Sequence, residues 1–63
     1  MGRREASRIA KQIYCNMGEY YLNMGDECWQ GYAADAGWTD KDAAVVFDYY
    51  ERTAQRVADW LGV

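Results

Sequence analysis

Residues 14–26, YCNMGEYYLNMGD, decide how the chain folds, because their two glycines can either end helices or lie within one. The six residues 14–19 recur almost unchanged at 21–26, seven residues later. A repeat of this length is typical of a helix that packs along a neighbouring helix. Inside a helix, Gly18 and Gly25 would each cost about 0.5–1 kcal/mol relative to alanine, a cost that makes sense where another helix approaches closely.

The polar residues on both sides of this stretch recur every three or four positions and fall in one arc, about 100° wide, of a helical wheel. They are Glu5, Arg8, Gln12, Asn16, Glu19, Asn23, Asp26 and Gln30. Their phase runs through both glycines, and we therefore favour one helix over residues 3–35. The alternative is that Gly18 and Gly25 are C-cap residues that split the segment, with Gly25 the favoured break, which would give three helices.

A second helix is predicted over residues 40–61 from its end signals. Gly37 suits the left-handed C-cap of the preceding helix, and Gly62 suits the end of the second one. Thr39 is a good N-cap, and Asp42 follows it at the third helical position of a capping box. The predicted core face of this helix consists of Ala43, Val46, Phe47, Tyr50, Ala54, Val57, Ala58 and Leu61.

The turn between the two predicted helices is short, so we expect an all-α antiparallel helical hairpin in a single domain of residues 1–63. The first helix has an apolar arc of about 220°, wider than one neighbour can cover. Two arrangements would cover the remainder. A homodimer could form a four-helix bundle, which we favour, or the N-terminal part could fold back as a further helix.

Composition excludes several classes of function. The chain has 63 residues, a net charge of −3, no His and only two cysteines, Cys15 and Cys28. Without His, neither cysteine has the usual base for nucleophilic catalysis, and we expect no enzyme, cofactor, metal site or small-molecule substrate. No apolar run reaches 18 residues, so we expect no membrane partner. Reduced cysteines are typical of a cytoplasmic protein.

Aromatic and acidic residues together predict a protein-binding surface, because Tyr and Trp dominate the energetics of interfaces and charge steers association. The expected aromatic anchors are Tyr20, Tyr21, Trp29, Tyr32 and Trp38. The acids expected to steer toward a basic partner, for example a nucleic-acid-binding protein, are Asp26, Glu27, Asp35, Asp40 and Asp42. The competing interpretation is that the aromatic residues simply form the core or the seam of a dimer.

Two other functional hypotheses remain open. The chain could be a structural or regulatory oligomer whose only partner is itself. It could also be a nucleic-acid-binding accessory protein, because Arg3, Arg4, Arg8 and Lys11 gather on the first helix, where they could touch phosphates.

In general character, the chain resembles the very small, acidic, aromatic-rich proteins that phages and mobile elements make to disable host systems, anti-CRISPR proteins among them. No sequence motif carries this resemblance. It implies a non-enzymatic inhibitor that docks on a host protein.

Overall fold

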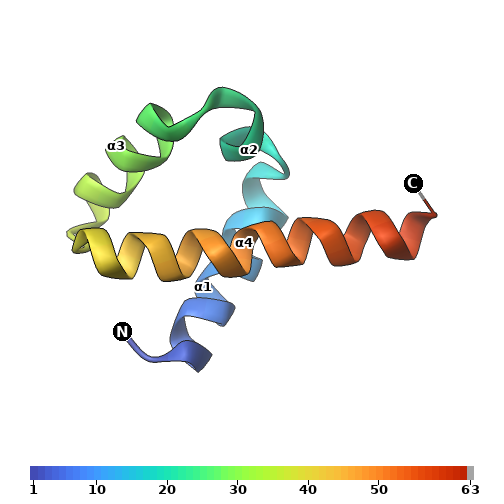
Figure 1. Cartoon of the computed structure of the whole chain (residues 1–63), viewed down its shortest axis with the longest axis horizontal. Coiled ribbons are helices and arrows are strands. Elements are labelled where there is room, and N and C mark those ends of the chain that lie inside the picture. The colour runs from blue at the N-terminus through green and yellow to red at the C-terminus, as the bar shows by residue number, and fades with distance from the viewer. Residues whose placement is uncertain (63) are drawn as a thin grey trace.

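The computed structural model describes residues 1–62 and folds them into four helices (Figure 1). These are α1 (Arg3–Met17), α2 (Tyr20–Met24), α3 (Asp26–Ala36) and α4 (Asp40–Leu61). The described residues contain no strand, so the prediction of an all-α protein is confirmed.

The longest helix, α4, has the predicted bounds, and its end signals act as expected. The Thr39 hydroxyl oxygen accepts a hydrogen bond from the backbone N–H of Asp42 at 3.1 Å, which caps the N-terminus of the helix. At the other end, Gly62 adopts the left-handed conformation with φ 77°. Gly37 ends α3 in the same way. Local chemistry alone is therefore enough to define α4.

The prediction of one helix over residues 3–35 is wrong, because the chain turns at both glycines. Gly18 ends α1 with φ 56° and ψ −134°, and Gly25 separates α2 from α3 with φ 89° and ψ 177°. Positive φ values strain every residue except glycine, so each glycine allows a turn that another residue would resist. The seven-residue repeat therefore marks two successive chain breaks and not a contact between long helices.

The breaks replace the simple hairpin with a wrapped arrangement around α4 (Figure 1). Helix α1 packs against α4, while α2 and α3 arch back above its N-terminal part. The C-terminal part of α4 projects beyond the other helices. The N-terminal part thus folds back as a separate helix, as the alternative prediction had it, and the chain covers part of its own apolar surface.

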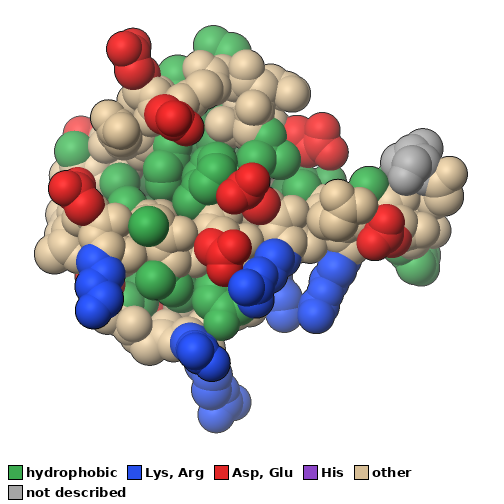
Figure 2. Space-filling view, in the orientation of Figure 1, with side chains coloured by type: hydrophobic (Ala, Val, Ile, Leu, Met, Phe, Trp, Pro, Cys, Tyr) green, Lys and Arg blue, Asp and Glu red, His purple; other side chains and the backbone are tan. Residues whose placement is uncertain are grey.

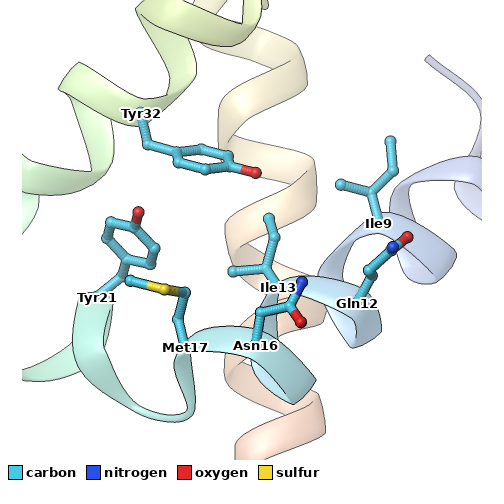
Figure 3. Close-up of a pocket in the computed structure, with 7 residues that line it drawn as sticks. All are labelled: Ile9, Gln12, Ile13, Asn16, Met17, Tyr21 and Tyr32. Atoms are coloured by element: carbon cyan, nitrogen blue, oxygen red, sulfur yellow. The ribbon is translucent and has the colours of Figure 1, made fainter.

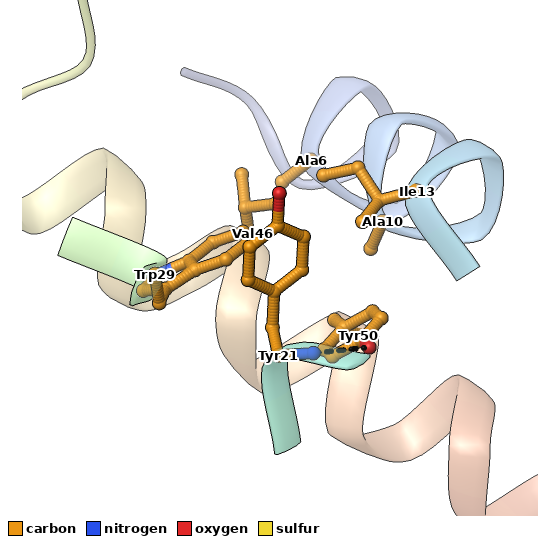
Figure 4. Packing of buried hydrophobic residues seen from close by; sticks show 7 residues of the cluster. All are labelled: Ala6, Ala10, Ile13, Tyr21, Trp29, Val46 and Tyr50. Carbon is orange, nitrogen blue, oxygen red and sulfur yellow. Dashed lines mark hydrogen bonds between the residues drawn. The ribbon is translucent and has the colours of Figure 1, made fainter. Parts of the chain in front are cut away.

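The core lies where α1, α2 and α3 meet the middle of α4 (Figure 4). Its buried cluster consists of Ala6, Ala10, Ile13, Tyr21, Trp29, Val46 and Tyr50. The two alanines are fully buried, and such small side chains let helices approach closely. On the other side of the core, the Trp29 ring stacks on Tyr50 with an interplanar angle of 9°, and Tyr21 meets Trp29 edge-on at 5.4 Å between ring centroids.

One side chain, Tyr50, links α4 to the first break. Its hydroxyl accepts a hydrogen bond from the backbone N–H of Tyr21 at 3.3 Å (Figure 4) and donates one to the carbonyl of Gly18. Helix α2 has no side-chain cap from its own N-cap residue, Glu19. The Tyr50 hydroxyl therefore satisfies an N–H that the start of α2 leaves without a helical partner.

Candidate binding surfaces

The five predicted aromatic anchors do not form one exposed surface. Tyr21 and Trp29 are 8% and 6% exposed, so both rings belong to the core and do not project toward a partner. Tyr32 and Trp38 are half-buried, and Tyr20 is 42% exposed. The core interpretation therefore holds for the two most buried rings, and Tyr20 is the most accessible of the five.

Trp29 shows why these rings are inside. Its indole Nε1 donates a hydrogen bond to the carbonyl of Ala43 at 3.2 Å, which satisfies the polar atom of an otherwise apolar ring. Tyr32 stacks on it at 5.6 Å, and Trp38 and Phe47 lie 5.9 and 5.1 Å away between ring centroids. The aromatic content of the chain thus builds a connected core that joins α3 to α4.

Burial also raises the pKa of both core tyrosines above the ordinary value, because an apolar environment disfavours the charged phenolate. The Tyr50 side chain is fully buried, and its hydroxyl is engaged by two backbone groups. Among residues 1–62, no group of three or more potential ligands could hold a metal ion. Cys15 and Cys28 are free thiols.

The predicted acidic residues divide between two helix starts. Asp26 and Glu27 are exposed in the first turn of α3, and Asp40 and Asp42 lie in the first turn of α4. Carboxylates at these places are stabilised by the helix dipole. Asp42 is half-buried and pairs with the N-terminal amino group at 3.1 Å. The fifth acid, Asp35, is exposed near the end of α3.

A pocket of about 290 Å³ opens between α1 and the α2–α3 segment (Figure 3). Tyr21 and Tyr32 face Ile9 and Ile13 across it, and Gln12, Asn16 and Met17 complete the lining. The pocket exists because α1 packs mainly against α4 while α2 packs mainly against α3. Its volume is just below the range for ligand pockets, which is about 300–1,000 Å³.

Three exposed apolar side chains adjoin this pocket along the chain. Met17 is 42% exposed, Tyr20 42% and Met24 54%. We refer to the pocket together with these three residues as the corner surface, because Met17 ends α1 while Tyr20 and Met24 begin and end α2. The predicted anchors are all aromatic and do not include the two methionines. Met17 and Met24 each lie directly before a glycine at which a helix ends, and this position is the sequence signal that could have identified them.

The predicted basic residues lie together. Arg3, Arg4, Arg8 and Lys11 are all exposed, and they line a shallow hollow on α1 with Ser7 and with Tyr49 of α4. The two ion pairs in the described part of the chain join the N-terminus to Asp42 and Arg52 to Asp48, so neither uses these four cations. Their placement on one face of α1 agrees with the prediction.

Within residues 1–62, no helix combines the length and apolar character needed to span a lipid bilayer. The fold and its surfaces define a small all-helical protein with an aromatic core and separate apolar and basic faces. Comparison with protein families, curated proteins and solved structures finds no match for this chain.

Proposed function

We propose that the protein is a non-enzymatic protein-binding module that takes its partner on the corner surface. The observation that supports this most directly is the open pocket between α1 and α2–α3, with exposed Met17 in its lining and exposed Tyr20 and Met24 on α2, the helix that contributes Tyr21 to the pocket. Met and Tyr are enriched at the cores of protein interfaces relative to the rest of a protein surface. Exposed apolar residues next to a concave site are typical of a docking surface.

The dimensions of the pocket favour one anchoring side chain of a partner protein. Its walls, Ile9, Ile13, Tyr21 and Tyr32, supply apolar contacts, and the amides of Gln12 and Asn16 supply hydrogen bonds. Binding energy at interfaces concentrates on such anchors, which fill well-packed pockets near the centre. We therefore expect an aliphatic or aromatic side chain of the partner to enter between the two tyrosines and α1.

The charge next to the corner surface favours a basic partner. Glu19 precedes α2, and Asp26 and Glu27 follow it, and all three are exposed. Acids at the rim of an interface raise the association rate with a positively charged protein and select against acidic ones. A nucleic-acid-binding protein of a host system has this chemistry. An inhibitory effect on such a system remains a prediction from the resemblance alone.

The test uses capture by photo-crosslinking in a lysate of the cells that make the protein. A photoreactive residue replaces Asn23 in α2, and the chain is compared with a Tyr20→Ser/Met24→Ser variant and with a Leu61→Ser control. Leu61 is 62% exposed at the far end of α4, so the control removes an apolar side chain that is more accessible than Tyr20 or Met24. We expect one basic protein to be captured by the parent and the control, and lost from the double variant. Equal capture by all three would refute the proposal.

A second copy of the chain is the alternative occupant of the corner surface, as the predicted homodimer requires. Sedimentation at about 10–100 micromolar protein distinguishes the two, because a dimer held by this surface should dissociate in the Tyr20→Ser/Met24→Ser variant and persist in Leu61→Ser. Under our proposal the parent protein is a monomer in this range. If the parent protein is a dimer that dissociates only in the double variant, the corner surface binds a second copy of the chain, and the proposal of a different protein partner is wrong.

A further inference from the structure

The basic hollow on α1 is a second surface, which the proposed protein-binding function does not use. Arg3, Arg4, Arg8 and Lys11 line it together with the hydroxyl-bearing Ser7. Glu5, the single acid of α1, is not among the lining residues. Clustered cations without acidic partners repel each other, and this cost is relieved when a polyanion binds. The hollow therefore has the charge of an anion site.

Helix α4 extends this surface beyond α1. Tyr49, which closes one side of the hollow, begins a series with Arg52, Arg56 and Trp60 at spacings of three, four and four residues, so all four lie on one face of α4. The Arg52 guanidinium lies over the Tyr49 ring at 5.3 Å from its centroid. We call the hollow together with these four residues of α4 the basic strip.

Trp60 is the most unusual residue of the strip. It is 85% exposed, the highest value among the exposed large apolar residues, although Trp is ordinarily well buried. It lies eleven positions after Tyr49, about 16 Å along the helix axis, on the part of α4 that projects from the body (Figure 1). No other helix covers this ring, so its face is free for stacking.

Exposed aromatic rings among cations are the chemistry of single-stranded nucleic acid binding. Cations neutralise successive phosphates, and an aromatic side chain stacks on an unpaired base. A duplex offers the phosphates but keeps its bases stacked on one another, so a ring such as Trp60 adds nothing to duplex binding. From this combination we propose that the basic strip binds single-stranded nucleic acid, with the backbone along Arg4, Lys11 and Arg56 and a base on Trp60.

The net charge of −3 does not oppose this inference, because the charges are segregated. In the view of Figure 2, Lys and Arg gather along the lower edge of the molecule, whereas Asp and Glu lie over its middle and upper part. The molecule measures 35 × 25 × 17 Å, and charges more than about 10 Å apart are largely screened at 0.1 M salt. Of the acids beside the strip in sequence, Asp48 pairs with Arg52 and Asp59 accepts a hydrogen bond from Gln55, whereas Glu5 and Glu51 are exposed.

The experiment measures anisotropy of a labelled oligothymidylate of about twelve nucleotides, and of a duplex of equal length, at several salt concentrations. We expect the single strand to bind more tightly than the duplex. Its affinity should fall with salt at a logarithmic slope of about −0.7 for each neutralised phosphate. Trp29 and Trp38 also fluoresce, so quenching that occurs in the parent protein and is absent from Trp60→Ala would report stacking on Trp60.

Two variants separate the two parts of the strip. Trp60→Ala should lower single-strand affinity about five- to a hundredfold with little change in salt slope, because it removes stacking and no charge. Arg4→Gln/Lys11→Gln should make the salt slope shallower by about 1.4, because it removes two phosphate contacts. The matched control is Lys41→Gln, an exposed base at the start of α4 outside the strip, and it should change neither.

These residues are exposed, so circular dichroism should confirm that each variant stays folded. Absence of binding at about 25 mM salt, where phosphate contacts are strongest, would overturn the inference. So would duplex binding as tight as single-strand binding, or tighter binding to vesicles of phosphatidylserine and phosphatidylcholine than to the oligonucleotide. The two proposals can fail independently: if the corner-surface variants still capture the protein partner, the measured binding of single-stranded nucleic acid to the basic strip is unaffected.

Discussion

Replacing Tyr50 with Phe is the sharpest test of why the chain breaks at Gly18. The substitution keeps the ring that stacks on Trp29 and removes only the hydroxyl that contacts two backbone groups. The backbone N–H of Tyr21, a buried residue, then loses its hydrogen-bond acceptor, and the carbonyl of Gly18 loses its donor. Both groups belong to the turn between α1 and α2, so the loss falls on the break itself.

The expected loss of stability follows from the two contacts. A buried N–H without a partner costs about 1–3 kcal/mol. Gly18 is half-buried, so water can reach its carbonyl and the second loss is smaller, about 0.5–1.5 kcal/mol. Together we expect about 1.5–4.5 kcal/mol, a large fraction of the roughly 3–9 kcal/mol that a chain of this length has in total. The Tm should fall by at least about 6 °C.

Urea denaturation followed by circular dichroism measures this loss. The control is Tyr49→Phe, the same chemical change at the neighbouring position, where no side-chain hydroxyl contact exists within residues 1–62. We expect the control to change stability by less than about 0.5 kcal/mol. If the two variants unfold at the same urea concentration, the Tyr50 hydroxyl does not hold the turn and the explanation of the break is wrong.

Three further predictions follow from local geometry. In the same denaturation assay, Gly25→Ala should destabilise the fold by about 1–3 kcal/mol, because φ 89° with ψ 177° suits only glycine. Gly31→Ala, in the exposed middle of α3, should stabilise the fold by about 0.5–1 kcal/mol, because alanine has the higher helix propensity. The pKa values of Tyr21 and Tyr50 are raised in the folded protein, and the stability linked to this shift is fully present below the unfolded pKa of about 10. This stability is lost as the pH rises through the folded pKa values. In an alkaline titration, tyrosinate absorbance should therefore increase together with the loss of helical circular dichroism. Thr39→Ala should cost about 1 kcal/mol through loss of the α4 cap, and Thr39→Ser should restore most of it.

The sequence predicts the bounds of α4 because the signals that define its ends are local, whereas Leu61, predicted for its core face, is 62% exposed. Thr39 and Asp42 are three residues apart, and their hydrogen bond forms within one turn of the chain. The glycines that end α3 and α4 also act within a few residues of the helices they close. Chemistry confined to one turn can be recognised without knowing where the rest of the chain lies.

The breaks at Gly18 and Gly25 could not be predicted in the same way. The polar phase of residues 5–30 is compatible with a continuous helix and with three shorter ones, since a short turn can preserve it. The contacts that favour the turn involve Tyr50, which is 32 residues from Gly18 and 29 from Tyr21 in sequence. Only the tertiary structure brings these groups together, and it overrides the helical pattern.

Errors about the candidate site follow from the same cause. A continuous helix would have left Tyr21 and Trp29 on a wide exposed arc, whereas the turns carry both rings into the core. The face shared by Arg4, Arg8 and Lys11 was predictable, because it depends on spacing within α1 alone. Tyr49 and Trp60 were not identified as its continuation, since their role depends on where α1 crosses α4 and where that cover ends.

The wrapped arrangement also explains how one small acidic chain can present two surfaces of different character. By turning twice, α1, α2 and α3 cover the first part of α4 and leave its C-terminal part bare, so Trp60 stays outside while Tyr21 and Trp29 go inside. The same turns place Asp26 and Glu27 beside the corner surface, whereas the bases of α1 and α4 lie along another edge. A basic protein and a nucleic acid strand would therefore meet separate parts of the molecule, each with the complementary sign of charge. The net charge of −3 averages over this separation, and neither surface can be inferred from it.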